Sequence, residues 1–472
     1  MQLIWFRQDL RLHDHTALWH AMQAGNTVAF VTLCPEQWAL HDDAPIKIHY
    51  YLQQLDQLRD QLSALNIPLI IRHIPRWSAI ADELLKISQS LQIQTVHAHI
   101  ELGVNELQRD AQVQHLLEEH NIKVELYHDR TIFPVGSIRN QSGQPYQVFG
   151  AFKKKCYEGL SLSVPSCYPM VDAQAPLAVH PLWQTEFDLA SFYPQGLSTQ
   201  QMDLWPVGEA HAQHSLDEFI QHGVEHYADE RDFPALNGTS RIGMCLNLGM
   251  LSIRQCLQAL FREQHGNFYL ENVGQQTWLD ELLWREFYQH ILFDFPRVSK
   301  HQPFQMKTTQ IHWRNAPDDL QAWQQGQTGI PIVDAGMRQL LATGWMHNRV
   351  RMICAMFLSK NLLIDWRLGE QWFMQHLVDG DLAANNGGWQ WCASTGTDAV
   401  PYFRVFNPIS QSQKFDPEGD YLRQWLPELA HLDTKQIHAP HAKKYQPELA
   451  YPLPIVDLKQ SRLHAIETFS AL

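Results

Sequence analysis

Short apolar segments alternate with amphipathic segments through the first 130 residues of the chain. The apolar segments have the length of β-strands, and the segments between them, such as 46–65 and 105–119, place apolar residues at helical spacing. Regular alternation of strand and helix predicts a parallel sheet covered by helices on both faces. We therefore expect an α/β domain of the Rossmann-like kind at 1–130, with five strands at 3–6, 27–33, 69–74, 95–100 and 123–127.

The alternation ends after residue 130. Residues 131–205 contain proline-, glycine- and serine-rich stretches such as FPVGSI and SVPSCYP, which show little periodicity and predict a connector. From residue 206 to residue 472 the apolar residues mostly follow helical spacing. The expected organisation is therefore an α/β domain at 1–130, a connector at 131–205 and an all-helical domain at 206–472.

Composition narrows the class of protein. Hydrophobic residues make up 45% of the chain and charged residues 18%, a balance typical of folded globular proteins. No apolar run approaches the roughly 18 residues of a membrane span, and a strand starts so early that a signal peptide has no room. The seven cysteines include no CxxC pair, so we expect reduced thiols in a cytoplasmic protein, without disulfides or a metal site.

The formal net charge of −14, taken alone, argues against a nucleic-acid partner. Such a partner would require arginine and lysine side chains to gather on one face. Two segments rich in polar and aromatic groups, 328–352 and 379–408, nevertheless indicate a specific ligand site.

In the first segment, TGIPIVDAGMRQLLATGWMHNRVRM, Asn348 and Met352 lie four residues apart and share one face of a helix. A carboxamide can hydrogen-bond an amide edge, and a thioether packs well against a flat apolar ring. Together the two side chains suit a pocket for a pyrimidine. Taken singly, each is more often an ordinary core residue, because most buried polar groups are simply hydrogen-bonded structure.

In the second segment, DGDLAANNGGWQWCASTGTDAVPYFRVFNP, Gly387 and Gly388 stand between two asparagines and the pair Trp389 and Trp391. Glycines let the backbone approach a flat ligand closely. Two residues apart on a helix, the two indoles point about 200° from each other. One of them can therefore face a ligand while the other faces the interior.

These two segments are similar, nearly position by position, to the signature of photolyases and cryptochromes. The resemblance extends in weaker form over almost the whole chain, beginning with WFRQDLRLHD at 5–14. Within that family the chain resembles class I cyclobutane pyrimidine dimer photolyases of the folate-antenna type. The resemblance implies an α/β antenna domain and a helical FAD-binding domain. It also implies FAD, reduced and anionic in the active form, and 5,10-methenyltetrahydrofolate as the antenna.

The resemblance implies a FAD site in which the run GTSRI at 238–242 contacts phosphate, Arg351 pairs with Asp379, and Asn385 faces flavin N5. Gly243 stands where the family commonly has a serine, which puts one phosphate hydrogen bond in doubt. Without the resemblance, TSR indicates only a helix cap. The full set of implied FAD residues is Tyr227, Thr239, Ser240, Arg241, Ile242, Trp278, Glu281, Arg285, Asn348, Arg351, Asp379, Asp381 and Asn385.

In WLDELLWREFYQH, the spacing of Glu281, Trp284 and Arg285 puts them on one helical face. By itself this pattern also fits an amphipathic helix with an intrahelical Glu–Arg pair. The resemblance makes this face a wall of the lesion pocket. The implied catalytic residues are Glu281, Trp284, Asn348, Met352 and Trp391. The implied DNA-binding residues are Arg231, Trp284, Arg285, Asn348, Arg349 and Trp391.

Two further sets of residues follow from the resemblance. Trp313, Trp366 and Trp389 correspond to a tryptophan chain that carries electrons to the flavin. The implied antenna-binding residues are His41, Asn105, Glu106 and Lys300. Packed core tryptophans and solvated surface side chains are the ordinary alternatives.

The implied activity is that of a deoxyribodipyrimidine photo-lyase, a carbon–carbon lyase acting on UV-damaged DNA. Light-driven electron transfer from reduced FAD opens the cyclobutane ring of a dimer that has flipped out of the duplex. We expect a monomer that does not associate with membranes.

Three alternatives to this activity remain open. The first is a cryptochrome-type blue-light photoreceptor, against which Asn385 speaks. The second is a (6-4) photoproduct photolyase, whose motif has two histidines where this chain has His347 and Asn348. The third is a flavin electron carrier or nucleotide-binding α/β protein, which would not need the lesion pocket.

Overall fold

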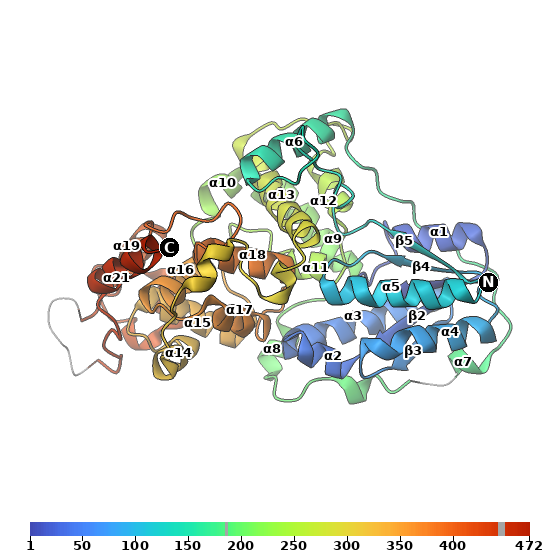
Figure 1. The fold of residues 1–472 in the computed structure, drawn as a ribbon, viewed down its shortest axis with the longest axis horizontal. Coiled ribbons are helices and arrows are strands. Elements are labelled where there is room, and N and C mark those ends of the chain that lie inside the picture. Colours follow the sequence, from blue (N-terminus) through green and yellow to red (C-terminus); the bar gives the residue numbers. More distant parts are fainter. Residues whose placement is uncertain (185–186, 442–448) are drawn as a thin grey trace. The chain divides into compact units, whose positions relative to one another are not determined.

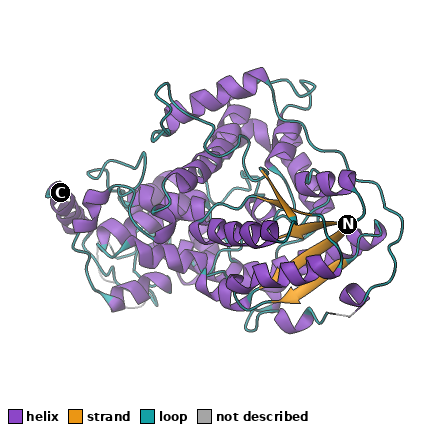
Figure 2. Ribbon diagram, turned by 45° about the vertical axis from the view of Figure 1, so that its right-hand side comes forward, coloured by secondary structure: helices purple, strands orange, loops and turns teal. Residues whose placement is uncertain are grey.

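The five expected strands form one parallel sheet (Figure 1), and Figure 2 shows all five strands lying together. The strand order is β3-β2-β1-β4-β5, and Leu3 of β1 is paired with Val28 of β2 and Val96 of β4. The order reverses between β1 and β4, where open parallel sheets form a crevice at the carboxyl ends of their strands. The strands are β1 (Gln2–Phe6), β2 (Thr27–Leu33), β3 (Leu69–His73), β4 (Thr95–His99) and β5 (Lys123–Tyr127).

The computed structural model describes residues 1–184, 187–441 and 449–472, and these residues fall into two compact units. The first unit contains Met1–Val224 and Ser240–Pro296, and the second contains Glu225–Thr239 and Arg297–Leu472. The domain boundaries expected at residues 130 and 205 both fall inside the first unit.

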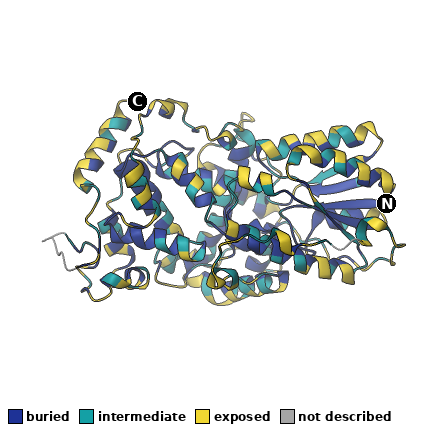
Figure 3. Cartoon of the chain, turned by 90° about the horizontal axis from the view of Figure 1, so that it is seen from below, coloured by how far each residue is buried: buried dark blue, intermediate teal, exposed yellow. Residues whose placement is uncertain are grey.

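Helices cover both faces of the sheet. Leu3 and Trp5 pack with apolar residues of α4 and α5, whereas Ile4 and Phe6 pack with those of α1 and α3. Successive side chains of a strand point to opposite faces, so one strand supplies both cores. The central strands β1, β2 and β4 are accordingly buried (Figure 3), whereas the edge strands β3 and β5 are only partly buried. The covering helices are α1 (Thr16–Ala24), α3 (Pro45–Ala64), α4 (Ile80–Ser90) and α5 (Val104–Glu119).

The range expected to be a connector contains a helix, α6 (Phe149–Leu162), as well as shorter helical turns. Phe149, Phe152, Cys156 and Leu160 are its buried residues, and their spacing is helical. The other helices of the first unit are α2 (Pro35–Leu40), α7 (Pro181–Gln184), α8 (Thr199–Asp203), α9 (Glu209–Glu218), α11 (Gly243–Asn247), α12 (Ile253–Leu260) and α13 (Val273–Asp294).

The second unit is built from helices around one core that includes Val350, Leu358, Trp366 and Trp389. No strand occurs among its described residues. The expected fold class, a five-stranded parallel α/β domain with a helical remainder, is confirmed. The helices are α10 (Tyr227–Glu230), α14 (Pro317–Gln324), α15 (Pro331–Thr343), α16 (Asn348–Met356), α17 (Trp366–Met374), α18 (Leu382–Cys392), α19 (Pro408–Phe415), α20 (Asp420–Trp425) and α21 (Leu458–Ser470).

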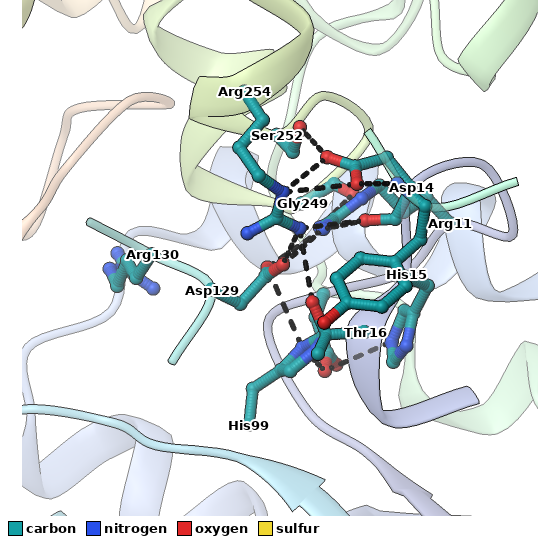
Figure 4. Close-up of polar contacts among 12 residues, drawn as sticks. Arg11, Asp14, His15, Thr16, His99, Asp129, Arg130, Gly249, Ser252 and Arg254 are labelled. Atoms are coloured by element: carbon teal, nitrogen blue, oxygen red, sulfur yellow. Dashed lines mark hydrogen bonds and ion pairs between the residues drawn. The ribbon is translucent and has the colours of Figure 1, made fainter. Parts of the chain in front are cut away.

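A buried network of charged side chains joins α12 to the carboxyl end of the sheet (Figure 4). Arg254 contacts Asp129 at 2.6 Å and Asp14 at 3.0 Å, and Arg11 contacts Asp129 at 2.7 Å. Ser252 also donates a hydrogen bond to Asp14. Burial opposes ionisation of Asp129, but the charges of Arg11 and Arg254 outweigh it and hold the pKa of Asp129 far below its usual range.

Gly249 lets the loop before α12 approach the segment that follows β1. Its φ is +76°, and a Cβ at this position would lie 2.3 Å from the Cα of Asp9. The neighbouring Leu10 N–H donates to the carbonyl of Leu248 at 3.3 Å. Only glycine fits both the left-handed backbone and the contact.

The substitution Gly249→Ala should lower the free energy of unfolding by about 3 kcal/mol, because it adds a left-handed backbone cost of about 1 kcal/mol to a clash with backbone atoms. Gly143→Ala is the matched control, since Gly143 has φ +74° and open space around its Cα. Urea unfolding followed by circular dichroism measures both variants. Equal losses would show that the contact with Asp9 contributes nothing.

Candidate functional site

One face of α13 carries the residues predicted for the lesion pocket. Glu281, Trp284, Arg285 and Tyr288 are partly exposed. The residues between them, Leu282, Leu283, Glu286 and Phe287, are buried. The helix begins at the N-cap Asn272, whose side chain accepts the N–H of Gln275. The expected face therefore exists, at spacing i, i+3, i+4 and i+7.

The side chains of this helix have different surroundings. The Arg285 guanidinium donates to the carbonyl of Arg130 at 2.7 Å, which fixes its position. Trp278, predicted for the FAD site, is 2% exposed and packs on Phe219 at 5.4 Å between ring centroids. The structure therefore gives Trp278 the surroundings of a core residue.

The run predicted to contact phosphate lies at the start of α11. Thr239 ends a segment of the second unit, and Ser240, Arg241 and Ile242 belong to the first. Ile242 is the N-cap and has no side-chain acceptor for the first N–H groups of the helix, which begins at Gly243. Such N–H groups suit an anion, and Gly243 removes a hydroxyl while keeping its N–H.

In the second unit, α16 and α18 pack against each other and carry most of the remaining predicted residues. Asn348 is exposed, and Met352 and Trp391 are partly buried. The Cys392 thiol lies 3.8 Å from the Met352 carbonyl oxygen. Asn348, Met352 and Trp391 are thus carried by two neighbouring helices.

The structure fixes the amide of Asn385. Its Nδ2 donates to the carbonyl oxygen of Glu370 at 2.9 Å, so its Oδ1 is turned toward the other side. Asp381 is the N-cap of α18 and accepts the N–H of Ala384 at 2.9 Å. Arg351 and Asp379 form the expected ion pair, with Nη2–O distances of 3.0 and 2.9 Å.

Two arginines predicted to bind DNA share one carboxylate. Arg349 contacts Asp232 at 2.7 Å, and Arg231 lies 4.0 Å from the same carboxylate. The Arg231 guanidinium lies 5.3 Å from the ring of Tyr227, which is 8% exposed. Asp229 and Glu230 precede Arg231 directly in the chain, so these two arginines lie among acidic side chains.

The predicted electron-transfer tryptophans belong to one core cluster. Trp366 and Trp389 are 0% and 2% exposed, and Trp313 is partly buried against the same cluster. Trp389 also contacts Trp323 edge to face at 5.9 Å and Phe373 at 5.0 Å. Trp313 therefore has the greatest exposure of the three predicted tryptophans.

Three of the predicted antenna residues come together. His41 Nε2 lies 3.0 Å from Asn105 Nδ2, and His41 Nδ1 lies 3.9 Å from a Glu106 oxygen. Burial raises the pKa of Glu106 above its usual value. Lys300 belongs to the second unit, where it ends the 3-10 turn Val298–Lys300 and is exposed.

His41 also lines a cavity of about 70 Å³ at the carboxyl end of the sheet. Large side chains fill this region: Trp38, Tyr51 and Trp77 all line the cavity. The volume is well below the roughly 300–1,000 Å³ of an ordinary ligand pocket. The described side chains therefore leave little room for a whole chromophore inside the sheet edge.

Sequence reasoning missed several residues that support the site. Glu370 and Asn386 are buried and hydrogen-bonded to each other at 2.8 Å, beneath Asn385. Lys360 is fully buried and bonds the Ser394 hydroxyl at 2.7 Å and the carbonyls of Tyr402 and Arg404 at 3.4 Å each. The role of Lys360 could not be recognised from its neighbours in the sequence, because its hydrogen-bond partners lie some 40 residues further along the chain.

Three side chains with metal-binding chemistry, Asp9, His15 and His99, also come together. His15 Nδ1 accepts the N–H of Leu18 at 3.0 Å, and His99 Nε2 accepts the N–H of Ala17 at 3.2 Å. Each ring must therefore carry its proton on the other nitrogen, which faces Asp9 at 3.2 and 2.7 Å respectively. A metal would need a lone pair where this arrangement places a donor, so we interpret the cluster as a hydrogen-bond network around one carboxylate.

This network predicts an acid-sensitive fold. Burial, followed by repulsion from His99, lowers the pKa of His15 from 6.5 to about 4. Between these values the unfolded chain binds a proton at His15 and the folded protein does not, so the free energy of unfolding falls as the pH falls. The contribution of His15 is roughly 3 kcal/mol. His15→Gln retains an acceptor for Leu18 and a donor for Asp9 but does not titrate. Urea unfolding at several pH values should show a smaller loss between pH 7 and pH 4 for the variant, and parallel curves would contradict the assignment.

Two family models match different parts of the chain. Residues 2–170 match the family model described as DNA photolyase, and residues 278–471 match the FAD binding domain of DNA photolyase. The chain is 42% identical over 474 residues to the deoxyribodipyrimidine photo-lyase of Escherichia coli, covering 99% of this chain and 98% of that protein. It is 36% identical over 497 residues to that of Neurospora crassa, covering 98% of this chain and 80% of that protein.

Solved structures with similar folds include both photolyases and a cryptochrome. A class III photolyase from Agrobacterium tumefaciens has a TM-score of 0.85 at 32% identity, covering 100% of this chain and 97% of that one. A Synechocystis cryptochrome has a TM-score of 0.84 at 28% identity, covering 99% of each chain. A Sulfolobus tokodaii photolyase with two FAD molecules has a TM-score of 0.82 at 28% identity, covering 100% of each chain. Together with the two matched family models, these full-length similarities show that the chain belongs to the DNA photolyase family.

Proposed function

We propose that this protein is a deoxyribodipyrimidine photo-lyase, which uses light and bound FAD to split cyclobutane pyrimidine dimers in DNA. The observation that carries the proposal is that α16 and α18 pack against each other and carry Asn348, Met352 and Trp391, which are predicted to line the lesion pocket. Full-length similarity to the photo-lyase of Escherichia coli supports it.

The residues of the chain fit FAD. The Oδ1 of Asn385, turned away from Glu370, is an acceptor suited to the N5–H of a reduced flavin, and the Arg351–Asp379 pair supplies a charge-balanced polar partner. When bound, reduced FAD supplies one excited electron to the dimer and recovers it after the two carbon–carbon bonds have broken, so no net oxidation occurs. The residues proposed to hold FAD are Tyr227, Thr239, Ser240, Arg241, Ile242, Trp278, Glu281, Arg285, Asn348, Arg351, Asp379, Asp381 and Asn385.

We assign the remaining steps to side chains of the protein. Arg231 and Arg349 bind the DNA backbone phosphates beside the lesion, since guanidinium groups pair well with phosphate. Trp391 packs against an apolar face of the flipped dimer, as aromatic side chains do with unpaired bases. Glu281 hydrogen-bonds a base edge. Trp313 is the most exposed of the three tryptophans that would carry an electron from the surface to the flavin.

The alternatives within the family remain distinguishable. Similarity to a cryptochrome shows that the fold alone does not separate repair from signalling. For a (6-4) photolyase, His347 would have to act as an acid or base, but it is 1% exposed and its Nδ1 accepts the N–H of Arg349 as a helix cap. Because its Nδ1 is occupied by the helix cap, His347 is poorly placed to act as an acid or base. This favours dimer repair over repair of the (6-4) photoproduct.

We propose 5,10-methenyltetrahydrofolate as the antenna, bound at the surface formed by His41, Asn105 and Glu106 with a contribution from Lys300. The cavity beside His41 is too small for a whole chromophore, which favours binding at the outer surface rather than inside the sheet edge. A related photolyase holds two FAD molecules, so a flavin antenna is the competing chemistry in this family.

We also propose that the protein acts as a cytoplasmic monomer. Its seven cysteines are free thiols, and six of them are buried. In the described ranges 1–184, 187–441 and 449–472, no helix has both the length and the apolar character that crossing a bilayer demands.

The central experiment mixes reduced, FAD-loaded protein with duplex DNA containing a thymine dimer and follows dimer loss with and without blue light. Loss should occur only in the light. Trp391→Ala should weaken binding of the dimer about five- to 150-fold, because stacking on a base contributes about 1–3 kcal/mol. Photoreduction of FAD without dimer loss would contradict repair and favour a photoreceptor, and loss of (6-4) photoproducts instead would favour that enzyme.

The antenna assignment has its own test. Glu106→Gln should weaken binding of 5,10-methenyltetrahydrofolate, followed by absorbance, about tenfold or more, because hydrogen bonds to charged groups contribute about 1.5–3 kcal/mol. Glu118→Gln, an exposed position on the same helix α5, is the control. Repair driven by direct excitation of flavin should stay unchanged in both variants. Equal folate affinity in the two variants would refute the assignment.

A further inference from the structure

One face of the Trp284 indole is covered by Phe149 of α6. The two ring centroids are 3.7 Å apart and the ring planes differ by 12°. Aromatic pairs in proteins are commonly about 4.5–7 Å apart, so the two rings are in close face-to-face contact, and the Phe149 ring restricts rotation of the indole out of its plane. Phe149 thus occupies one face of the partly buried Trp284, and the rings of Phe287 and Tyr288 also contact the indole, at 5.8 and 5.7 Å between centroids.

The helix that carries Phe149 is anchored to α13 on both sides of this stack. Lys153 contacts Asp280 at 2.9 Å, and Tyr157 donates its hydroxyl to the same carboxylate at 2.8 Å. Phe152 packs against Phe287 at 5.2 Å between ring centroids. Contacts one turn apart fix the register of α6, and with it the position of the Phe149 ring.

We propose that Phe149 is a positioning residue for lesion recognition, which acts through Trp284 and rests on the proposed dimer repair. Phe149 holds the indole in the one orientation that presents its outer face to a flipped dimer. Without the ring behind it, Trp284 would occupy several rotamers, and the apparent affinity for the lesion would fall with the fraction that is binding-competent.

The geometry distinguishes this role from ordinary core packing. Phe152, on the same helix, is 1% exposed and fills the core against Phe287 and His290. Phe149 is nearly as buried, at 7%, yet its closest ring contact is the predicted lesion-binding side chain.

The test compares Phe149→Leu and Phe149→Tyr with the matched control Phe152→Leu in FAD-loaded protein. The readout is the ratio of dissociation constants for dimer-containing and undamaged duplexes of the same sequence, together with KM and kcat for repair. Phe149→Leu should lower this discrimination about three- to tenfold through the lost aromatic pair and raise KM more than it lowers kcat. Phe149→Tyr keeps the ring and should restore discrimination to within about twofold of the wild type. Phe152→Leu should lower the melting temperature but leave discrimination unchanged.

Equal losses of discrimination in Phe149→Leu and Phe152→Leu would reduce Phe149 to a packing residue and overturn the proposal. So would wild-type discrimination in Phe149→Leu while the wild-type protein repairs dimers. A wild-type protein that neither prefers dimer DNA nor repairs it would instead overturn the proposed function itself, which the same measurements show directly.

Discussion

The buried pairing of Arg11 and Arg254 with Asp14 and Asp129 is the constraint on which the first unit depends. It joins the segments that follow β1 and β5 to α12, so chain regions more than 230 residues apart meet at one point. Two positive and two negative charges compensate each other away from water. Removing any one would leave an uncompensated buried charge, which is far more costly than the pairing is favourable.

The side chains that we propose to be functional are supported by a second layer of residues that need not touch a ligand. Glu370 turns the amide of Asn385, Lys360 gathers the loop after Trp391, and Phe149 fixes the plane of Trp284. Each supporting contact restricts a side chain that would otherwise sample several rotamers. Chemistry performed by a bound cofactor requires such positioning more than it requires acid or base groups on the protein.

For an acidic chain, binding of DNA depends on where the individual charged side chains lie. The net charge of −14 describes the whole surface, but recognition depends on local potential. Arg231 and Arg349 converge on the single carboxylate of Asp232, while many acidic residues elsewhere are paired with arginines in the α/β domain, as Asp110 is with Arg7. Asp229 and Glu230 lie beside Arg231 in the chain, so a phosphate must compete with carboxylates for these two guanidinium groups.

The sequence by itself determined the five strands, because a strand buried on both faces must be a short apolar run, as 28–31 shows. It also determined which residues of α13 share a face, whereas the pairing of Arg351 with Asp379 was expected from the resemblance to photolyases. Only the tertiary structure decided the stack of Phe149 on Trp284, the burial of Lys360 and the tautomers of His15 and His99. Periodicity reports contacts within one element, whereas these features depend on backbone and side-chain atoms that the fold brings together from distant positions.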